Sequence, residues 1–309
     1  MIRQSMPSLT RWPPLLRPRA FGIQRRRLHE GRAVLDVSLG ECDHVIQVFG
    51  ANTDVGKTVI TAGLLRAAAL QGLRASYIKP VQAGSPSDAS FVSRHANEAG
   101  NKTGGGGSPD DAPSPLCRVS TLFDYSDPVS PHLAAERDGG HVASDTDVVE
   151  AVVKEIKVVL SSDCSSSSSS VSGNLVLVEA AGGVLSPAPS GSLQADAFRP
   201  MRLPVLLVGD GKLGGIGATL SALESLRTRG YSVLGIALFA QDQHLGNADA
   251  VSRHAGSIPV YELPALPPAE LPLGPWYGDG ATKQAFRGLL DGLAEGRAAA
   301  AARLAGMEA

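Results

Sequence analysis

The chain has 309 residues, of which 43% are hydrophobic and 19% are charged. This composition is typical of one globular α/β domain with appendages, and it excludes a fibrous or wholly disordered protein. No stretch approaches the roughly 18 unbroken apolar residues needed to span a bilayer, so we expect no membrane partner. Cys42, Cys117 and Cys164 are isolated and form no CxxC pair, so neither a disulfide framework nor a zinc site is indicated.

The formal net charge of −2 is unevenly distributed. Residues 1–40 contain eight arginines against Glu30 and Asp36, so this segment carries +6 and the remainder −8. An Arg-rich, nearly acid-free N-terminus is typical of an organelle transit peptide, which predicts a mitochondrial address, or alternatively a plastid one, on residues 1–42. The other interpretation is a disordered basic arm that binds nucleic acid, but the acidic remainder argues against a nucleic-acid partner.

In chain order, the first predicted strand is 44–49, followed by a glycine-bearing turn over 50–56 and a helix over 57–71. A second short strand is predicted over 75–78, and we expect it to stop at Lys79-Pro80 because proline cannot donate to a ladder. Residues 100–115 and 161–172 are rich in Gly, Pro and Ser, which predicts flexible surface insertions.

Ser144 and Asp147 fit a capping box that opens a helix with buried apolar positions up to Leu160. Three apolar runs, 175–178, 205–208 and 233–238, are typical of strands buried on both faces. Helices are predicted near 216–229, 247–255 and 281–295. The alternation predicts an α/β protein, namely a parallel β-sheet flanked by helices on both faces, with ligands at the carboxyl ends of the strands. We expect a P-loop domain over 43–280 and a C-terminal helical tail over 281–309.

The strongest chemical signal is the segment from Gly50 to Thr58, which reads GANTDVGKT. A strand that runs into such a loop and then a helix indicates a P-loop, in which backbone N–H groups surround phosphates, Lys57 neutralises them and the Thr58 hydroxyl can ligate Mg²⁺. The usual spacing would place the first glycine at Ala51, whereas this sequence has it at Gly50. The loop is therefore a variant of the common motif.

Glu179 ends the predicted strand 175–178 and precedes the small residues Ala180 to Gly183. In a sheet of this type its carboxylate would face the P-loop and complete a magnesium site, while the glycines would let backbone approach phosphate. The alternative is a solvated acid at a strand end. Lys79 ends the second strand and would point into the same crevice, where a second lysine indicates a negatively charged intermediate. Asp88, in the loop after Gly84, is a further candidate metal ligand.

Two further segments carry chemistry. Lys212 and the glycine-rich segment 213–217 follow the strand 205–208, which favours a second anion site, with ordinary turn glycines as the alternative. Ser130-Pro131-His132 begins a predicted helix, with Pro131 suited to its first position. His132 has no partner in the sequence that would make it a catalytic base.

Together these segments resemble dethiobiotin synthetase, in the form found at the front of the plant and algal protein fused to diaminopelargonate aminotransferase. The resemblance covers residues 44–270 and rests on five short blocks in a fixed order: 50–58, 77–84, 130–132, 178–183 and 211–214. It implies the P-loop NTPase fold.

The family's functional residues fall on positions of this chain that match its motifs. By the resemblance, the residues that bind ATP and its metal would be Asn52, Thr53, Asp54, Val55, Gly56, Lys57, Thr58, Asp88, Glu179, Ala180, Ala181, Gly182, Phe239 and Pro264. The magnesium ligands would be Thr58, Asp88 and Glu179, the catalytic lysines Lys79, Lys57 and Lys212, and the substrate-side residues Ala83, Ser130, Leu213, Gly214 and Gly215.

The resemblance also implies a reaction. CO₂ (or bicarbonate) would form a carbamate on one amine of 7,8-diaminopelargonate, the carbamate would attack the γ-phosphate of ATP, and the second amine would close the ureido ring. It implies a homodimer, with the substrate carboxylate near the Lys-Leu-Gly loop and partly across the interface, and an aminotransferase as a fused domain or partner.

Two positions depart from the family pattern. Ala83 stands where a hydroxyl residue is usual, and Phe239 stands where the bacterial form has an asparagine that reads adenine, which leaves nucleotide preference open. Residues 262–264 would then supply the other wall of the base site. The alternatives are another amidoligase-like P-loop enzyme, a partitioning-type ATPase switch, and a catalytically silent remnant.

Overall fold

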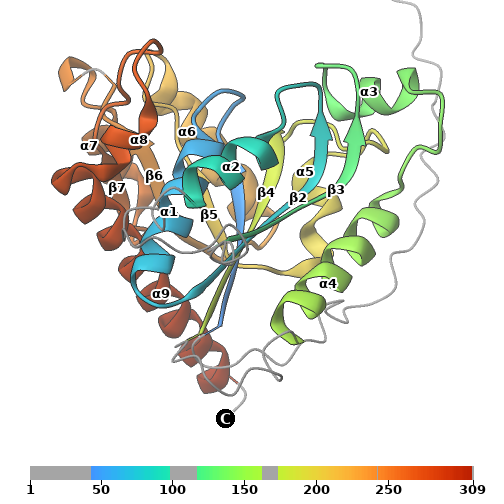
Figure 1. Ribbon diagram of the computed structural model, residues 1–309. Coiled ribbons are helices and arrows are strands. Elements are labelled where there is room, and N and C mark those ends of the chain that lie inside the picture. The colour runs from blue at the N-terminus through green and yellow to red at the C-terminus, as the bar shows by residue number, and fades with distance from the viewer. Residues whose placement is uncertain (1–42, 98–116, 162–172, 242, 308–309) are drawn as a thin grey trace, which may run out of the picture. The chain divides into compact units, whose positions relative to one another are not determined.

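The computed structural model describes residues 43–97, 117–161, 173–241 and 243–307, which all lie in one compact unit, Ala33–Ala309. Within these residues, seven parallel strands form one sheet in the order β3-β2-β4-β1-β5-β6-β7 (Figure 1). The strands are β1 (His44–Gly50), β2 (Arg74–Ala83), β3 (Cys117–Tyr125), β4 (Asn174–Gly183), β5 (Val205–Val208), β6 (Val233–Phe239) and β7 (Val260–Leu263). The predicted parallel sheet is confirmed.

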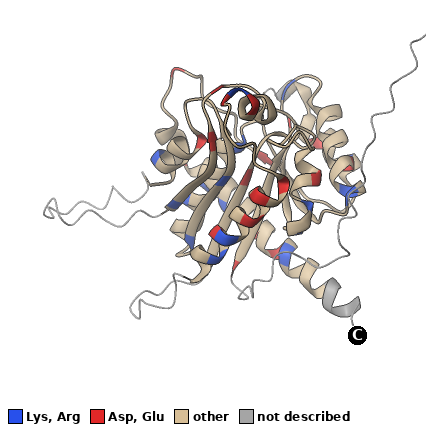
Figure 2. Ribbon diagram, turned by 90° about the vertical axis from the view of Figure 1, so that its right-hand side faces the viewer, with Lys and Arg blue, Asp and Glu red and all other residues tan. Residues whose placement is uncertain are grey.

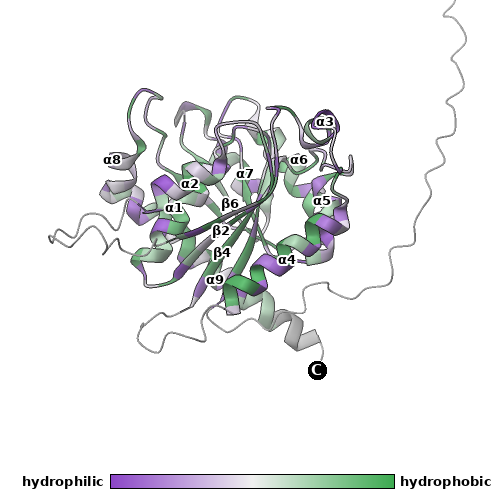
Figure 3. Ribbon diagram, turned by 45° about the vertical axis from the view of Figure 1, so that its right-hand side comes forward, coloured by the Kyte–Doolittle hydropathy of each residue, from purple (hydrophilic) through white to green (hydrophobic). Residues whose placement is uncertain are grey.

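Helices cover both faces of this sheet. One face packs against α1 (Lys57–Leu70), α2 (Asp88–Asn97), α8 (Leu273–Gly278) and α9 (Gly280–Met307). The other packs against α3 (Pro131–Arg137), α4 (Asp145–Ser161), α5 (Gln194–Ala197), α6 (Gly215–Thr228) and α7 (Asn247–Ala255), and the short 3₁₀ turns are η3 (Arg199–Met201) and η4 (Gln243–Leu245). The helices cover the sheet because its strands are hydrophobic. Figure 3 shows these strands and helix α4, which carries hydrophobic and hydrophilic residues in alternation along its length.

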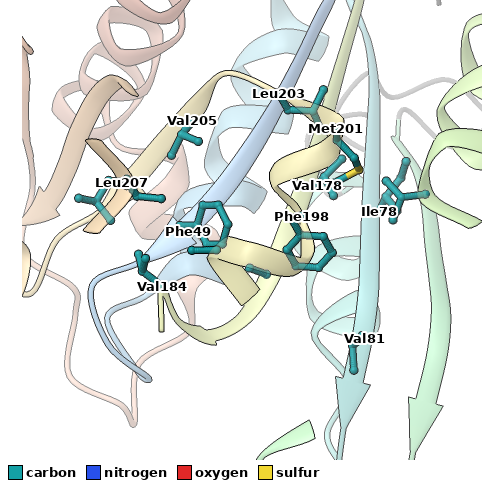
Figure 4. Close-up of a cluster of buried hydrophobic side chains, with 14 of the residues drawn as sticks. Phe49, Ile78, Val81, Val178, Val184, Phe198, Met201, Leu203, Val205 and Leu207 are labelled. Atoms are coloured by element: carbon teal, nitrogen blue, oxygen red, sulfur yellow. The ribbon is translucent and has the colours of Figure 1, made fainter. Parts of the chain in front are cut away.

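The two faces enclose two apolar cores. On the α4 side, the Phe49 ring lies 6.3 Å from that of Phe198, between residues of β5 and β2 (Figure 4). On the α1 side, Phe286 and Leu289 of α9 pack against α1, so the first half of α9 belongs to the folded core. Basic and acidic residues are interspersed along the ribbon in Figure 2. Among the described residues, no helix is long and apolar enough to cross a membrane.

Most of the predicted elements are present. The helix predicted over 57–71 is α1, those near 216–229, 247–255 and 281–295 are α6, α7 and α9, and the capping box is real. Ser144 N donates to Asp147 Oδ2 at 2.9 Å and Asp147 N donates to Ser144 Oγ at 3.2 Å. The predicted insertion 100–115 lies outside the described residues, as do 162–172 and the predicted transit peptide.

The prediction for the second strand was wrong at its end. β2 continues through Pro80 to Ala83, because its ladder with β4 ends earlier, at Ile78 opposite Val178, while its ladder with β3 resumes at Val81 opposite Phe123. Proline at this point therefore removes no bond from the β4 ladder. The strands β3 and β7 and the helices α2, α5 and α8 were not predicted.

The order of the strands determines where a ligand can bind. β1 lies between β4 and β5, and the chain leaves β1 toward β2 on one side and returns to β5 on the other. Such a reversal leaves a crevice outside the carboxyl ends of the central strands. The loop after β1, the end of β2 and the end of β4 all meet at this crevice.

Candidate functional site

The loop between β1 and α1 has the shape of a P-loop around Lys57. The Lys57 ammonium donates to the carbonyl oxygen of Asn52 at 3.2 Å, and Lys57 is 7% exposed. Asp54 and Gly56 adopt left-handed backbone with φ of 55° and 89°. Burial lowers the pKa of Lys57, and the carboxylate of Glu179 opposes that shift. The predicted strand, loop and helix are confirmed here.

The first glycine of the loop is Gly50, one position earlier than in the common motif, and steric contacts explain this position. A Cβ at residue 50 would lie 2.8 Å from the carbonyl oxygen of Asn52 and 2.9 Å from Nζ of Lys57. Such contacts are shorter than van der Waals distance, so only glycine fits where the loop folds back over its lysine.

We therefore expect Gly50→Ala to displace Lys57 and to lower the affinity for ATP by about tenfold or more. The added methyl group would push against the lysine and against the loop that surrounds the phosphates. Calorimetric titration with a non-hydrolysable ATP analogue measures this. Gly288→Ala is the control, because a Cβ there meets nothing within 4 Å and alanine favours a helix. Equal affinity of the two variants would contradict this account of Gly50.

Register brings Lys79 and Glu179 together. Ile78 pairs with Val178 as the last pair of the β2–β4 ladder, so Lys79 and Glu179 are the next residues of two adjacent strands. Ile78 and Val178 point into the core on the α4 side. Because side chains alternate along a strand, Lys79 and Glu179 point to the opposite face, toward α1.

At that face Lys79 is held between two carboxylates. Its Nζ lies 3.0 Å from Oε1 of Glu179 and 2.5 Å from Oδ2 of Asp88, while Lys79 is 2% and Glu179 0% exposed. Burial alone lowers the pKa of Lys79, but the charges of Glu179 and Asp88 outweigh it and raise that pKa above its ordinary value. The ammonium form is therefore favoured.

Asp88 was predicted to lie in a loop, but it is the first residue of α2. Its backbone N–H donates to Oε1 of Gln82 at 3.1 Å, which ties the start of the helix to the end of β2. A carboxylate in the first turn of a helix is stabilised there by the helix dipole. This tether could not be predicted from local sequence, because Gln82 is six residues away and lies on a strand that was expected to end before it.

Helix α1 supplies two hydroxyl groups to the same carboxylate. Thr58 Oγ1 donates to Oε1 of Glu179 at 3.0 Å, and Thr61 Oγ1 donates to Oε2 at 2.8 Å. Residues three apart lie on one face of a helix, so both hydroxyl groups reach Glu179. Thr61 was missed in the sequence because it lies outside the P-loop motif. Tyr77 is buried nearby, and burial followed by the charge of Glu179 raises its pKa well above the ordinary value.

Lys57, Thr58, Lys79 and Asp88 open onto a cleft of about 690 Å³. The predicted site residues that line it are Thr53, Asp54, Gly56, Lys57, Thr58, Lys79, Ala83, Asp88, Ser130, Ala181 and Gly182. Lining residues that were not predicted include Gln82, Pro128 and Ser186. β4 continues past the predicted strand end through Glu179 to Gly183, and Oγ of Ser186 accepts from the backbone N–H of Gly183 at 2.8 Å, at the glycine end of this strand.

Other predicted site residues lie elsewhere. Asn52 lines a neighbouring hollow, Val55 is buried, and Glu179 and Ala180 lie beneath the cleft. Lys212, Leu213 and Gly214 are exposed on the loop before α6, and Gly215 opens that helix; none of the four lines the cleft.

Phe239 lies beneath the P-loop and does not line the cleft. It is 3% exposed, its ring centroid lies 6.0 Å from that of Trp276, and a Cβ on Gly56 would lie 2.5 Å from its ring. Pro264 follows β7, and the segment after it lines a second cleft of about 960 Å³ together with Gln241 and Val59. Val59 lines both clefts, so the two adjoin.

Comparison with known proteins gives a consistent picture. A family model described as "AAA domain" matches residues 44–271. The chain is 35% identical over 228 residues to the ATP-dependent dethiobiotin synthetase of Rhodopseudomonas palustris, covering 73% of this chain and 89% of that protein. Among solved structures, the cell division ATPase MinD of Pyrococcus furiosus is similar over 82% of this chain and 97% of that one, with 15% identity and a TM-score of 0.49.

Larger relatives match as well. The mitochondrial bifunctional dethiobiotin synthetase/7,8-diamino-pelargonic acid aminotransferase of Oryza sativa is 37% identical over 294 residues, and that of Arabidopsis thaliana 34% over 269 residues, covering 80% and 71% of this chain. The chain spans only 33% and 31% of the length of those two enzymes. The match to the shorter bacterial enzyme over nearly its whole length decides the family: this chain belongs to the dethiobiotin synthetases.

Proposed function

We propose that this chain is an ATP-dependent dethiobiotin synthetase, a ligase of biotin biosynthesis that closes a ureido ring on 7,8-diaminopelargonate. The observation that carries the proposal is the cluster of buried Lys57, Lys79 and Glu179 with the partly exposed Asp88 beside a P-loop, in a chain of this family. Two lysines at the γ-phosphate end of a P-loop suit a reaction in which one anion must attack another.

In this proposal the loop from Asn52 to Thr58 binds the triphosphate through its backbone N–H groups, with Lys57 at the β- and γ-oxygens. Lys79 lies across the cleft, where its ammonium would neutralise the carbamate oxygens and the transferred phosphoryl group. Ala181 and Gly182 line the cleft with exposed backbone and let phosphate approach closely. Lys212 would neutralise further negative charge from outside the cleft.

The donor set suits magnesium. Thr58, Asp88 and Glu179 offer only oxygen atoms, which Mg²⁺ prefers, and few protein ligands suffice because phosphate oxygens and water complete its shell. Within the described residues, no cluster of three or more His, Cys, Asp or Glu could hold a metal by itself. When bound, Mg²⁺ supplies positive charge at the phosphate oxygens.

The proposed chemistry has three steps. One substrate amine forms a C–N bond to CO₂ and releases a proton, which gives a carbamate. The carbamate oxygen attacks the γ-phosphorus, and the bond to ADP breaks. The second amine then attacks the carbamate carbon, phosphate leaves and a second proton is released, so the products are dethiobiotin, ADP and phosphate. The buried lysines favour the first two steps because they stabilise the anions that meet there.

The substrate would enter along Ala83 and Ser130, which line the cleft opposite the P-loop. We place its carboxylate tail at Leu213, Gly214 and Gly215 of a second copy, because none of the three lines the cleft of its own chain, Leu213 and Gly214 are exposed, and Leu213 is 88% exposed. The proposed enzyme is therefore a homodimer. Ala83 carries no hydroxyl, so one hydrogen bond worth about 1 kcal/mol is missing there.

The nucleobase would lie in the adjoining cleft, between Val59, Gln241 and the segment after Pro264. Phe239 supports the P-loop from below and offers no hydrogen bond to a base, so nucleotide preference would depend on this cleft. The proposal also includes a mitochondrial address, or a plastid one, on residues 1–42, and an aminotransferase as a fused domain or partner. It is supported by the plant relatives, whose names include both features.

The test is direct. Residues 43–309 are purified and incubated with 7,8-diaminopelargonate, ¹⁴C-bicarbonate, Mg²⁺ and ATP, CTP or GTP in turn, and labelled dethiobiotin is measured. We expect product that depends on the diamine, on nucleotide and on Mg²⁺. Hydrolysis of ATP without incorporation of label would favour a partitioning-type switch or another amidoligase-like enzyme, and neither hydrolysis nor product would indicate a silent remnant.

A further inference from the structure

One hydrogen bond at the base of the site lies below the cleft. Thr61 Oγ1 donates to Oε2 of Glu179 at 2.8 Å, and both residues are 0% exposed. Thr61 belongs to the second turn of α1, after the P-loop has ended, and it does not line the cleft. It therefore reaches the site only through Glu179.

The two carboxylate oxygens of Glu179 have different surroundings. Oε2 accepts from Thr61, whereas Oε1 accepts from Thr58 at 3.0 Å and lies 3.0 Å from Nζ of Lys79. Oε1 is thus the oxygen beside the two groups that line the cleft, and Oε2 is anchored in the helix behind it. A glutamate side chain has several rotatable bonds, so one anchored oxygen fixes where the other points.

A buried carboxylate also needs partners for its own stability, and a hydroxyl at 2.8 Å would satisfy that need wherever it came from. The positions of the donors also determine how the carboxylate of Glu179 is oriented. Thr58 and Thr61 donate from one face of α1 to opposite oxygens of one carboxylate, so the carboxylate is held between them. Loss of the Thr61 bond leaves Thr58 and Lys79 on the same oxygen and lets the group rotate about its last bond.

We infer that Thr61 is a positioning residue, which anchors Oε2 of Glu179 so that Oε1 faces the magnesium and lysine side of the cleft. The inference rests on the proposed function, because it takes Glu179 to be a magnesium ligand. Partners that orient a metal ligand from behind typically change metal affinity by about 10- to 100-fold when they are removed.

Three variants separate this role from a merely structural one. Thr61→Val keeps the shape of the side chain and removes the hydroxyl, while Thr61→Ser keeps the hydroxyl. Thr282→Val is the matched control, because Thr282 is a buried threonine, 1% exposed, on helix α9 and outside the site. For each variant, calorimetry gives the affinity for ADP with and without Mg²⁺, and the ratio of the two measures the magnesium-dependent gain.

We expect Thr61→Val to reduce this gain about tenfold, with metal-free ADP affinity unchanged, and to raise the Mg²⁺ concentration for half-maximal activity by a similar factor. Thr61→Ser should restore both to within about twofold of the wild type, and Thr282→Val should change only the melting temperature. If Thr61→Val does not fold, Thr61→Cys, which keeps the volume and a weak donor, should show an intermediate loss.

The inference is overturned if Thr61→Val, or Thr61→Cys in its place, keeps the magnesium-dependent gain of the control, or if Thr61→Ser loses it. A wild type that makes no dethiobiotin but shows a Thr61-dependent gain would defeat the proposed function and leave the positioning role standing. If the wild type makes dethiobiotin while Thr61→Val keeps the full magnesium-dependent gain, the proposed function stands and the positioning role of Thr61 is overturned.

Discussion

Lys79→Met is expected to lower kcat for dethiobiotin formation by about a thousandfold or more, while the affinity for ADP with Mg²⁺ changes by less than about fivefold. The reason is position. Lys79 lies on β2, outside the P-loop, with its ammonium beside Glu179 and Asp88, whereas nucleotide phosphates would be bound by the loop and Lys57. Methionine fills most of the volume and removes the charge. Steady-state kinetics and calorimetry on one preparation separate the two quantities.

The same substitution should also destabilise the fold, because it leaves a carboxylate that is 0% exposed with less compensation. Breaking a buried pair by removing one partner costs about 3 kcal/mol or more. The pKa of Lys79 is raised in the folded protein, so this stabilisation is present in full below the ordinary lysine pKa and is lost only as pH rises through the raised value. At neutral pH the whole effect should appear in denaturant unfolding.

Lys154→Met is the matched control, since Lys154 is exposed on α4 and away from the cleft. It should leave kcat, nucleotide affinity and unfolding unchanged within about 0.5 kcal/mol. A Lys79→Met enzyme with a near-normal kcat would remove Lys79 from the chemistry, whatever its stability.

The sequence was informative wherever the signal is local. A strand, a glycine loop and a helix over 44–70 can be read from adjacent residues, because the P-loop needs glycine at Gly50 and Gly56 for steric reasons and Lys57-Thr58 for chemical ones. The central strands were equally clear, since each is buried on both faces and so is continuously apolar.

The signals that were missed are not local. β3 forms one side of the sheet next to β2, and its sequence CRVSTLFDY mixes polar and apolar residues because it is only partly buried. Without β3 as a partner, β2 appeared to end at Pro80. The contact of Lys79 with Asp88 and Glu179 depends on the register between β2 and β4 and on the tether from Gln82, and neither is encoded within a short window.

The charges of the cluster explain why magnesium is part of the proposal. Lys57 and Lys79 are balanced by Asp88 and Glu179, so the four side chains carry no formal net charge. A triphosphate and a carbamate each bring negative charge to this point, and the lysines already compensate two carboxylates. Further positive charge must therefore come with the nucleotide. Glu179 contacts both Lys79 and the hydroxyl groups of α1, and it is also a proposed ligand of the metal.

Glu179→Gln tests this role of the carboxylate with the least change in the shape of the side chain. Three donors point at the carboxylate, from Thr58, Thr61 and Lys79, but an amide offers one oxygen and one NH₂ group, so at least one donor would face another donor. The substitution also leaves the cluster with an excess positive charge, which repels a cation. We expect the Mg²⁺ concentration for half-maximal activity to rise at least about tenfold, and kcat to fall as well.

A magnesium titration at fixed ATP measures this, with Glu155→Gln as the control. Glu155 on α4 also accepts from a cation and a hydroxyl, Arg118 at 2.9 Å and Ser120 at 2.6 Å, but it lies on the opposite face of the sheet. Both variants thus lose a paired carboxylate, and they differ only in whether that carboxylate belongs to the candidate site. A raised magnesium requirement in Glu179→Gln alone assigns the effect to the site, whereas equal titrations would mean that Glu179 balances charge within the fold and that the metal is held by other groups.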